Sequence, residues 1–360
     1  MPAQPPKTPL ELGFYMPAEW YPHAGTWLTW PKDPETWPGR VAQVEEIYLE
    51  FIAALAPHET VNLLVDDETT AQSVRHRCNF NGAENVRFHQ IPTVDSWIRD
   101  YGPNFLISDR GAGAFNDWIF NAWGNKYEAL KQDDQIPRLL EPVLQVPRFT
   151  PEIVLEGGAI DVNGEGCVLT TEQCLLNTNR NPQLSRAEIE TYLKTYLGVA
   201  KVLWLGEGIV GDDTDGHIDD IARFVAPNVI VCAVEDNPED ANYKLLQDNL
   251  ARLQRMTDAG NRPFEIVTLP MPGVVGGEST ASRNLDRLPA SYANFYIANH
   301  VVLLPVFGHA NDARAVETLQ RVFPDRRVIP INCEPLVWGM GTIHCLSQQQ
   351  PRTNTTLTNR

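Results

Sequence analysis

The sequence predicts an α/β protein built from several strand–helix–strand modules of roughly equal size. An apolar run, a helical stretch and a second apolar run recur in this order along the 360 residues. In addition, 43% of the residues are hydrophobic, which is enough for a large buried core. No linker or low-complexity run divides the chain, and its length allows either two domains or one large one.

Four of these recurrences are clear and a fifth is weak. Their helices are marked by apolar residues at helical spacing, such as Val316, Leu319 and Val322, or by a capping box, such as Ser185 with Glu188. The clear copies span residues 61–92, 167–206, 229–270 and 301–332, and the weak copy falls within 114–156.

An ordinary α/β sheet would also alternate strands and helices. A Rossmann fold requires a GxGxxG motif after an early strand, and the sequence contains neither this motif nor a phosphate-binding GxxxxGKS/T loop. A pseudosymmetric ring of modules therefore stays open, and function is then expected where the modules converge.

The chain is strongly acidic, with 46 Asp and Glu against 29 Lys and Arg and a net charge of −17. This charge disfavours nucleic acid and anionic membranes as partners and favours a cationic small molecule. The N-terminus lacks the apolar core of a signal peptide, no stretch is long enough to span a membrane, and the six cysteines include no CxxC pair. We expect a cytoplasmic protein with free thiols.

Two segments outside the helical repeats combine carboxylates with turn residues. DSWIRDYGPNFL at 95–106 places Asp100 before a Gly-Pro turn, which can hold a carboxylate at a set angle, although a local ion pair with Arg99 would also explain it. VLEGGAID at 154–161 ends an apolar run in Glu156, and two glycines follow. Glycines there would let backbone pack beside the carboxylate, although a plain turn explains them about as well.

The third segment, GDDTDGHIDD at 211–220, invites a metal interpretation. It does not match an EF-hand loop, and the spacing of Asp215, His217 and Asp219 resembles a manganese site of arginase-like ureohydrolases. The second acidic ligand segment of those enzymes is missing, so no metal site is predicted. Alternatively His217 is a general base and Asp219 binds a cation. If residues 217–221 are extended, both side chains face one pocket.

Cys345 lies in GTIHCLSQQQP near the end of the chain. A free cysteine is more often packed and inert, which is our interpretation of Cys78, Cys167, Cys174, Cys232 and Cys333. A thiolate, a histidine and a carboxylate pair nevertheless suit one reaction. The carboxylates bind a guanidinium, the thiolate attacks its central carbon, and the histidine protonates the departing ammonia. This is the deimination of a guanidine.

Eight stretches together resemble the agmatine deiminases, which belong to the guanidino-group-modifying enzymes called penteins and to the bacterial peptidyl-arginine-deiminase-like family. They run from residue 16 to residue 351. In chain order they are MPAEWYPHAGTWLTWP, WIRDYGP, FNAWG, LEGGAIDVNGEG, LTTEQCLLNTNRNPQLSR, DDTDGHIDDIARF, SYANFYIAN and GTIHCLSQQQP.

The resemblance implies a five-module α/β propeller around a pseudo-fivefold axis, in agreement with the four clear recurrences and the weak fifth. It assigns the nucleophile to Cys345, the general acid/base to His217, and the guanidinium-binding carboxylates to Asp100 and Asp219. It makes Glu156 a further active-site carboxylate, which either orients the histidine or holds the substrate.

The resemblance also bears on three neighbouring side chains. Trp97 is expected to pack on the aliphatic stem or the guanidinium face of the substrate, and Trp123 is a second candidate for this role. His344 is expected to face away from the thiol, because residues 341–345 are interpreted as a closing strand and neighbours on a strand point to opposite faces.

The implied reaction converts agmatine to N-carbamoylputrescine and ammonia through a covalent S-alkylthiouronium, with no metal or cofactor. It belongs to putrescine biosynthesis or to arginine and agmatine catabolism. The family implies a single catalytic domain over residues 1–360 and suggests a homodimer; we expect flexible tails at 1–12 and 352–360.

Two stretches depart from the commonest agmatine-specific pattern, GMGTIHC and DWIFNAWGNKYEALKQDD. They leave peptidyl-arginine, free arginine or another guanidine open as the substrate. The alternative from a different class is a catalytically silent guanidine-binding protein.

Overall fold

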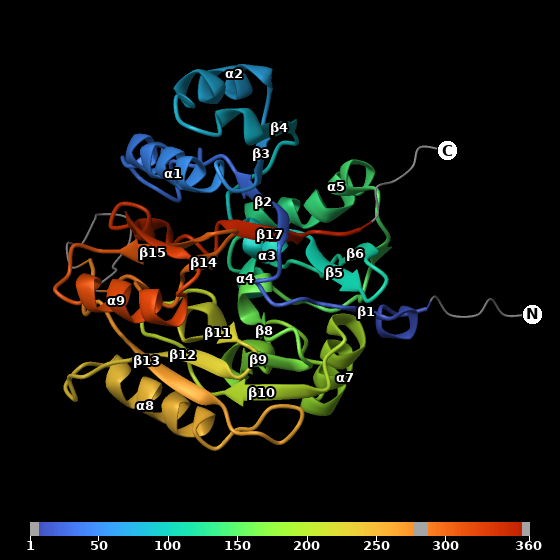
Figure 1. Ribbon diagram of the computed structural model, residues 1–360, viewed down its shortest axis with the longest axis vertical. Coiled ribbons are helices and arrows are strands. Elements are labelled where there is room, and N and C mark those ends of the chain that lie inside the picture. The colour runs from blue at the N-terminus through green and yellow to red at the C-terminus, as the bar shows by residue number, and fades with distance from the viewer. Residues whose placement is uncertain (1–6, 277–286, 355–360) are drawn as a thin grey trace, which may run out of the picture.

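The computed structural model describes residues 7–276 and 287–354. Within these residues the strands form five separate sheets, which surround a common centre (Figure 1). Every sheet repeats one arrangement: two antiparallel strands, a helix, and a further strand parallel to the second. The five-module α/β propeller predicted from the sequence is therefore confirmed.

The five modules follow one another along the chain. Module 1 contains β17 (Ser347–Pro351), β2 (His23–Thr29), α1 (Val41–Leu55) and β3 (Thr60–Val65). Module 2 contains β5 (Asn104–Ser108), β6 (Gly113–Asn116), α5 (Ile136–Leu144) and β7 (Arg148–Phe149), with β1 (Phe14–Tyr15) at its edge. Module 3 contains β8 (Asp161–Val162), β9 (Cys167–Thr171), α7 (Arg186–Leu197) and β10 (Lys201–Leu205). Module 4 contains β11 (Ala222–Ala226), β12 (Val229–Val234), α8 (Asn242–Leu253) and β13 (Glu265–Pro270). Module 5 contains β14 (Tyr296–Ile297), β15 (Val301–Val306), α9 (Asp312–Val322) and β16 (Arg327–Asn332).

Short helices occupy the connections. The α-helical ones are α3 (Ile98–Tyr101), α4 (Ala122–Asn125) and α6 (Glu172–Leu175). The 3₁₀ helices are η1 (Leu10–Leu12), η2 (Ala83–Asn85), η3 (Ala129–Gln135), η4 (Gly157–Ala159), η5 (Ile218–Asp220) and η6 (Val337–Gly339).

Module 1 corrects one predicted recurrence. Residues 61–92 do form a strand–helix–strand unit, β3–α2–β4, in which α2 spans Glu68–Arg77 and β4 spans Val86–Gln90. The core of the module is instead β2–α1–β3, and α2 and β4 extend its sheet outward at the top of Figure 1. The weak recurrence within 114–156 is confirmed by β6, α5 and β7.

The last described strand closes the ring, because β17 pairs antiparallel with β2. This strand begins at Ser347, so the closing strand predicted over 341–345 is wrong. The chain bends there instead, and the backbone N–H of Ser347 donates to the carbonyl of His344 at 3.1 Å. The bend leaves Cys345 in contact with segments of other modules.

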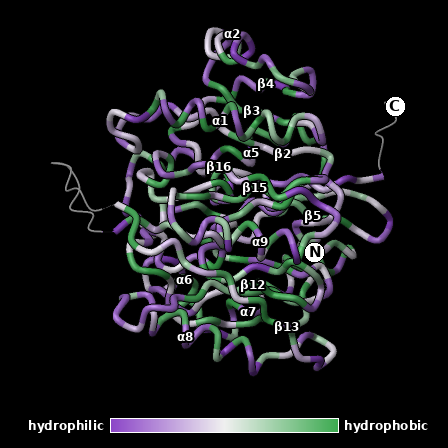
Figure 2. The backbone as a smooth tube through the Cα atoms, turned by 60° about the vertical axis from the view of Figure 1, so that its left-hand side comes forward, coloured by the Kyte–Doolittle hydropathy of each residue, from purple (hydrophilic) through white to green (hydrophobic). Residues whose placement is uncertain are grey.

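The central strands supply much of the core, because both of their faces are covered. β12 (VIVCAV) and β15 (VVLLPV) are almost fully buried. The helices turn one apolar face inward, and α7 begins with the predicted capping box of Ser185 and Glu188. Figure 2 shows hydrophobic stretches through the interior and hydrophilic ones in the outer loops.

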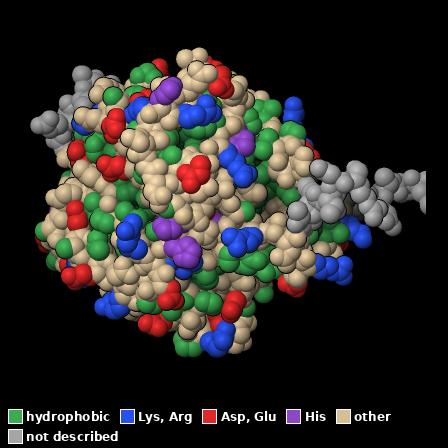
Figure 3. Space-filling model, turned by 45° about the horizontal axis from the view of Figure 1, so that its top comes forward, with side chains coloured by type: hydrophobic (Ala, Val, Ile, Leu, Met, Phe, Trp, Pro, Cys, Tyr) green, Lys and Arg blue, Asp and Glu red, His purple; other side chains and the backbone are tan. Residues whose placement is uncertain are grey.

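Three further observations concern membrane-spanning helices, the charge of the surface and the two ends of the chain. No helix in 7–276 or 287–354 is long and apolar enough to pass through a membrane. On the face shown in Figure 3, acidic and basic side chains are mixed. The flexible tails expected at 1–12 and 352–360 fall mostly on residues 1–6 and 355–360, which lie outside the described residues. Of the remainder, Leu10–Leu12 form η1 and the Asn354 N–H donates to the Gly111 carbonyl at 2.9 Å.

The segments singled out in the sequence occupy equivalent places in the ring. Asp100 on α3 comes shortly before β5, Glu156 before β8, His217 and Asp219 before β11, and Cys345 before β17. Each is therefore carried by the segment that enters a module at its first strand. Equivalent positions in a pseudosymmetric ring meet near its axis, so the repeat brings these side chains together.

Candidate active site

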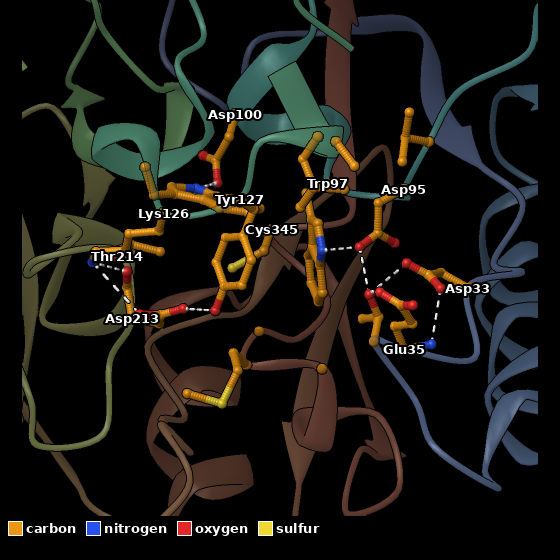
Figure 4. A pocket seen from close by; sticks show the side chains of 18 of the residues that line it. Asp33, Glu35, Asp95, Trp97, Asp100, Lys126, Tyr127, Asp213, Thr214 and Cys345 are labelled. Atoms are coloured by element: carbon orange, nitrogen blue, oxygen red, sulfur yellow. Dashed lines mark hydrogen bonds and ion pairs between the residues drawn. The ribbon is translucent and has the colours of Figure 1, made fainter. Parts of the chain in front are cut away.

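A cavity of about 750 Å³ opens at the centre of the ring (Figure 4). Asp100 and Cys345 lie on its wall, together with the rings of Trp97 and Trp123. His217, Asp219 and Glu156 lie behind this wall and are at most 1% exposed. The five predicted catalytic residues therefore form one buried cluster, of which two members reach the cavity.

Asp100 is held by neutral donors. Its Oδ1 accepts from the backbone N–H of Gly158 at 3.0 Å, and its Oδ2 accepts from the indole N–H of Trp123 at 2.9 Å. Burial raises the pKa of Asp100 to about 6, although the nearby His217 acts in the opposite direction. The alternative ion pair with Arg99 is not formed, because that guanidinium reaches Glu19, Gln349 and the His344 carbonyl instead.

The Gly-Gly pair after Glu156 is required by close packing. A Cβ on Gly158 would lie 2.6 Å from His217 Nδ1, 2.8 Å from Asp100 Oδ1 and 3.1 Å from Asp219 Oδ2. A Cβ on Gly157 would lie 2.1 Å from the carbonyl oxygen of Arg99. Backbone therefore packs into the middle of the cluster, as the sequence predicts.

His217 is buried beside acidic groups. Its Nδ1 lies 3.7 Å from Asp100 Oδ1, and neither ring nitrogen has a hydrogen-bond partner among the described residues. Burial would lower the pKa of His217, but Asp100, Cys174 and Glu156 outweigh burial and raise this pKa well above its usual value. The surroundings of His217 therefore favour the cationic form of the imidazole.

Glu156 is fixed by a fully buried arginine. Its Oε1 accepts from Arg180 Nε at 2.7 Å, while its Oε2 has no partner among the described residues. Arg180 also binds Asp215 Oδ2 at 2.6 Å. One oxygen of Glu156 is thus occupied and the other is free beside His217.

The pKa values of Asp219 and its neighbour Asp220 are shifted in opposite directions. Burial would raise the pKa of Asp219, but His344 outweighs burial and keeps this pKa below its usual value. Burial, followed by the charge of Asp219, raises the pKa of Asp220 well above its usual value. The geometry supports an ionised Asp219 next to a protonated Asp220, because two buried like charges cannot both ionise at low cost. Residues 218–220 form the 3₁₀ helix η5, so the condition that 217–221 is extended is not met, yet both His217 and Asp219 enter the cluster.

His344 does not face away from the site. Its Nδ1 is 2.7 Å from Asp219 Oδ2, and its Nε2 is 2.8 Å from Glu19 Oε2. Burial would raise the pKa of Glu19, but Arg223, His344 and Arg99 lower it below its usual range. Each ring nitrogen of His344 thus contacts a buried carboxylate. The prediction failed because the chain bends at this point.

Cys345 is buried, and its Sγ lies 3.8 Å from Asp219 Oδ2. Burial, then Asp219, Asp220 and Asp100, raise the pKa of this thiol well above its usual value. The empty site therefore holds a thiol rather than a thiolate, as expected for a cysteine surrounded by carboxyl groups.

Both tryptophans line the cavity, and their indole groups have different partners. The Trp97 indole N–H donates to Asp95 Oδ2 at 2.9 Å (Figure 4), whereas that of Trp123 donates to Asp100. Trp123 has a left-handed backbone, with φ of 52°, which is uncommon for a bulky residue. Gly341 allows the Trp97 ring to approach, because a Cβ there would lie 2.6 Å from that ring.

The exposed part of the cavity lining is charged. It contains Asp33, Glu35, Glu128 and Asp213 together with Lys32 and Lys126, whereas Asp95 lines the cavity from a buried position. Lys32 pairs with Asp66, and Lys126 pairs with Asp215 at 2.9 Å. The basic groups are thus already paired, and acidic groups predominate at the mouth.

The metal alternative finds little support in the 211–220 segment. Asp212 accepts hydrogen bonds from Thr214, Gly216 and the His217 backbone, and Asp215 binds Arg180. Among the described residues one group of potential ligands remains: Glu156, Cys174 and His217, whose donor atoms lie within 4.8 Å of one another. Asp215, His217 and Asp219 do not come together as one group of potential ligands among the described residues.

Several residues of the cluster were not assigned from the sequence. Arg180, Glu19 and Asn294 lie within stretches that carry the family resemblance, but their partners are distant in the chain. Cys174 was interpreted as packing, and it is buried, yet it lies beside His217. The signal in the sequence that could have pointed to Arg180 and Asn294 is the clustering of polar residues in the stretches NTNRNP and SYANFYIAN.

Comparison with known proteins agrees with this geometry. A family model described as Porphyromonas-type peptidyl-arginine deiminase matches residues 15–351. An agmatine deiminase of Ectopseudomonas mendocina is 39% identical, over 96% of this chain and 97% of that relative. The solved agmatine deiminase of Enterococcus faecalis has a TM-score of 0.90 at 36% identity, over 96% of this chain and 98% of its own. A substrate-bound cysteine-to-serine variant of C. jejuni agmatine deiminase has a TM-score of 0.84 at 30% identity, over 94% and 97% of the two chains. The chain therefore belongs to the Porphyromonas-type peptidyl-arginine deiminase family.

Proposed function

We propose that this protein hydrolyses agmatine to N-carbamoylputrescine and ammonia through a covalent adduct on Cys345. The observation that carries the proposal is that a thiol, an imidazole and three carboxyl groups, from the entry segments of four modules, converge at one cavity. Agmatine deiminases align with nearly the whole chain, which supports agmatine as the substrate.

Binding is the first step. The guanidinium is held by Asp100 and by Asp219, whose Oδ1 has no partner among the described residues. Trp97 and Trp123 flank the bound stem, since both rings line the cavity. The positive charge of the substrate beside Cys345 counteracts the carboxyl groups and favours the thiolate, so the substrate assists in activating its own nucleophile.

Two chemical steps follow. The thiolate of Cys345 attacks the guanidinium carbon, and the cationic form of His217 gives its proton to the departing ammonia. This leaves an S-alkylthiouronium. His217 then takes a proton from water, and the resulting hydroxide attacks the same carbon. The tetrahedral adduct loses its hydroxyl proton to solvent as the carbon–sulfur bond breaks, which releases the ureido product and the thiolate.

Glu156 is proposed to orient His217 rather than to bind the substrate. Arg180 donates to one of its carboxylate oxygens. A carboxylate oxygen of Glu156 also lies within 4.8 Å of a ring nitrogen of His217. A fixed carboxylate behind an imidazole sets its orientation and favours its cationic form.

The charge of the cavity mouth supports agmatine over arginine or peptidyl-arginine. Agmatine ends in an ammonium, whereas arginine carries a carboxylate and a peptide carries neutral amides. Acidic groups outnumber basic ones at the mouth, and both lysines there are paired with carboxylates. A distal cation is therefore attracted and a distal carboxylate repelled.

We also propose that residues 1–360 form one catalytic domain that works in the cytoplasm as a homodimer, without nucleic-acid or membrane partners. The family resemblance supports the domain and the dimer. The net charge of −17 supports the absence of nucleic-acid and membrane partners.

Incubation with agmatine, free arginine and a peptidyl-arginine substrate, with ammonia and the ureido product measured in each case, tests the proposal. Ammonia and a ureido product from agmatine alone are expected. Urea with putrescine, lost on addition of EDTA, would indicate a metal ureohydrolase. Turnover of peptidyl-arginine alone would overturn the substrate but not the mechanism, and agmatine binding without turnover would indicate a silent binder.

A further inference from the structure

The fifth entry segment also places a polar side chain at the centre of the ring. Asn294 comes shortly before β14, in the place that Asp100, Glu156 and Cys345 take before the first strands of their own modules. It is 1% exposed, and its Nδ2 lies 3.2 Å from Cys345 Sγ. Each of the five modules thus contributes to the cluster through the same kind of segment.

Its hydrogen bonds determine which way the Asn294 amide points. The Oδ1 accepts from the backbone N–H of His344 at 3.0 Å and from the hydroxyl of Thr342 at 2.7 Å. A backbone N–H can only donate, so the amide oxygen must face it. The NH₂ group is then directed to Cys345 Sγ and to Asp220 Oδ1, which is 3.0 Å away.

The other side-chain atoms within reach of the sulfur are acceptors. Among the described residues, Asn294 supplies the side-chain N–H within hydrogen-bond distance of Sγ, whereas Asp219 Oδ2 at 3.8 Å and Asn294 Oδ1 at 3.5 Å can only accept from the thiol. Burial, followed by the surrounding carboxyl groups, raises the pKa of Cys345, and a hydrogen bond from the backbone of Thr342 acts in the opposite direction. A donor directed at the sulfur favours the thiolate and also opposes this rise. Since the donor is neutral, it does so without repelling a cationic substrate.

We propose that Asn294 is a catalytic residue whose amide N–H donates to the Cys345 thiolate and holds it for attack, with Thr342 as the positioning residue that fixes the amide. The inference rests on the proposed function for its place in the reaction. The contact itself concerns the free enzyme and is tested without agmatine.

The test measures the rate of alkylation of Cys345 by iodoacetamide as a function of pH, with the modified peptide identified by mass. In Asn294→Ala the rate at about pH 8.5 is expected to fall roughly tenfold, and the inflection to move up by about one unit, because one pKa unit is a tenfold change in thiolate. Asn294→Asp, which is nearly isosteric, is expected to react more slowly still, since an ionised carboxylate opposes the thiolate.

Two further variants separate this role from a structural one. Thr342→Val keeps the His344 contact to the amide and is expected to slow alkylation less than either Asn294 variant. Asn249 is also fully buried, and it bonds Gly206 and Glu207 away from the site, so Asn249→Ala is the matched control and should leave the profile unchanged. Should Asn294→Ala not fold, Asn294→Asp decides the question.

Profiles of both Asn294 variants within twofold of the wild type would overturn the proposal, as would an equal change in Asn249→Ala. A wild-type enzyme that fails to turn over agmatine would sink the proposed function instead, and the alkylation profile would still decide the role of Asn294.

Discussion

The inner end and the mouth of the cavity both carry many charges, but they hold them differently. At the inner end, His217, Asp219 and Glu156 are at most 1% exposed, and Arg180 and His344 fix the two carboxylates. At the mouth, the side chains of Lys126 and Asp213 are 28% and 30% exposed. Buried charges interact strongly and shift one another's pKa, whereas exposed pairs are weakened by solvent. The comparison implies that changes at the inner end affect chemistry and pH dependence, and changes at the mouth affect only substrate preference.

The largest expected effect comes from removing the nucleophile. Cys345→Ala is expected to lower kcat by about 10³-fold or more, because no other described thiol reaches the cavity wall. Agmatine should still bind, since Asp100 and Asp219 remain, and calorimetry with this variant measures that binding. Residual turnover near the wild-type rate would contradict the covalent mechanism.

His344→Gln tests whether the buried imidazole of His344 holds Asp219 in place. The variant loses a charge-assisted hydrogen bond worth about 1.5–3 kcal/mol, so agmatine affinity is expected to fall roughly tenfold to a hundredfold. The dissociation constant is measured in the Cys345→Ala background, with and without the second substitution. Lys126→Gln, which breaks a partly exposed pair, is the control, and similar losses in both variants would remove the distinction between the two ends.

Substitutions of Trp123 and Trp97 form a matched pair that tests how the pKa of Asp100 sets the pH dependence of kcat/KM. Asp100 must be ionised to bind a guanidinium, and its pKa of about 6 predicts that kcat/KM falls as the pH falls through that value. Trp123→Phe removes a donor to the ionised form, so the pKa of Asp100 rises further and the acid limb moves up by roughly one unit.

Trp97→Phe is the control, because its indole donates to Asp95 instead. Its acid limb is expected to stay in place. An equal shift in the two variants would mean that the acid limb of the kcat/KM profile does not reflect the ionisation of Asp100.

The smallest effect is expected at the mouth. Asp213→Asn removes a partly exposed charge, and such groups contribute about 0.2–1 kcal/mol, so KM for agmatine should rise less than about fivefold. Its kcat should not change. A large loss of kcat would show that the mouth takes part in the chemistry.

The sequence predicted much of the fold because the modules repeat. Apolar runs and helical spacing reveal a strand–helix–strand unit, and the chain contains several such units. The same pattern led to a wrong prediction of the module core at 61–92. The added elements α2 and β4 lie there beside the actual core, β2–α1–β3. Pairing between β17 and β2, which lie at opposite ends of the chain, has no local signal.

The site was predicted unevenly, for a physical reason. Cys345, His217 and the three carboxylates stand in distinctive short stretches, and the structure brings them together. Their supporting residues depend on contacts between distant segments, such as Arg180 with Glu156 and His344 with Glu19. The orientation of His344 was predicted wrongly because strand alternation does not apply where the chain bends.

The covalent intermediate tests the central claim most directly. The wild-type protein is mixed with agmatine, quenched in acid within the first turnovers and analysed by intact mass and peptide mapping. We predict a species heavier by one agmatine less one ammonia, with the added mass on the peptide that contains Cys345 and absent from Cys345→Ala. Ammonia release without any such adduct, at every quench time, would contradict the account.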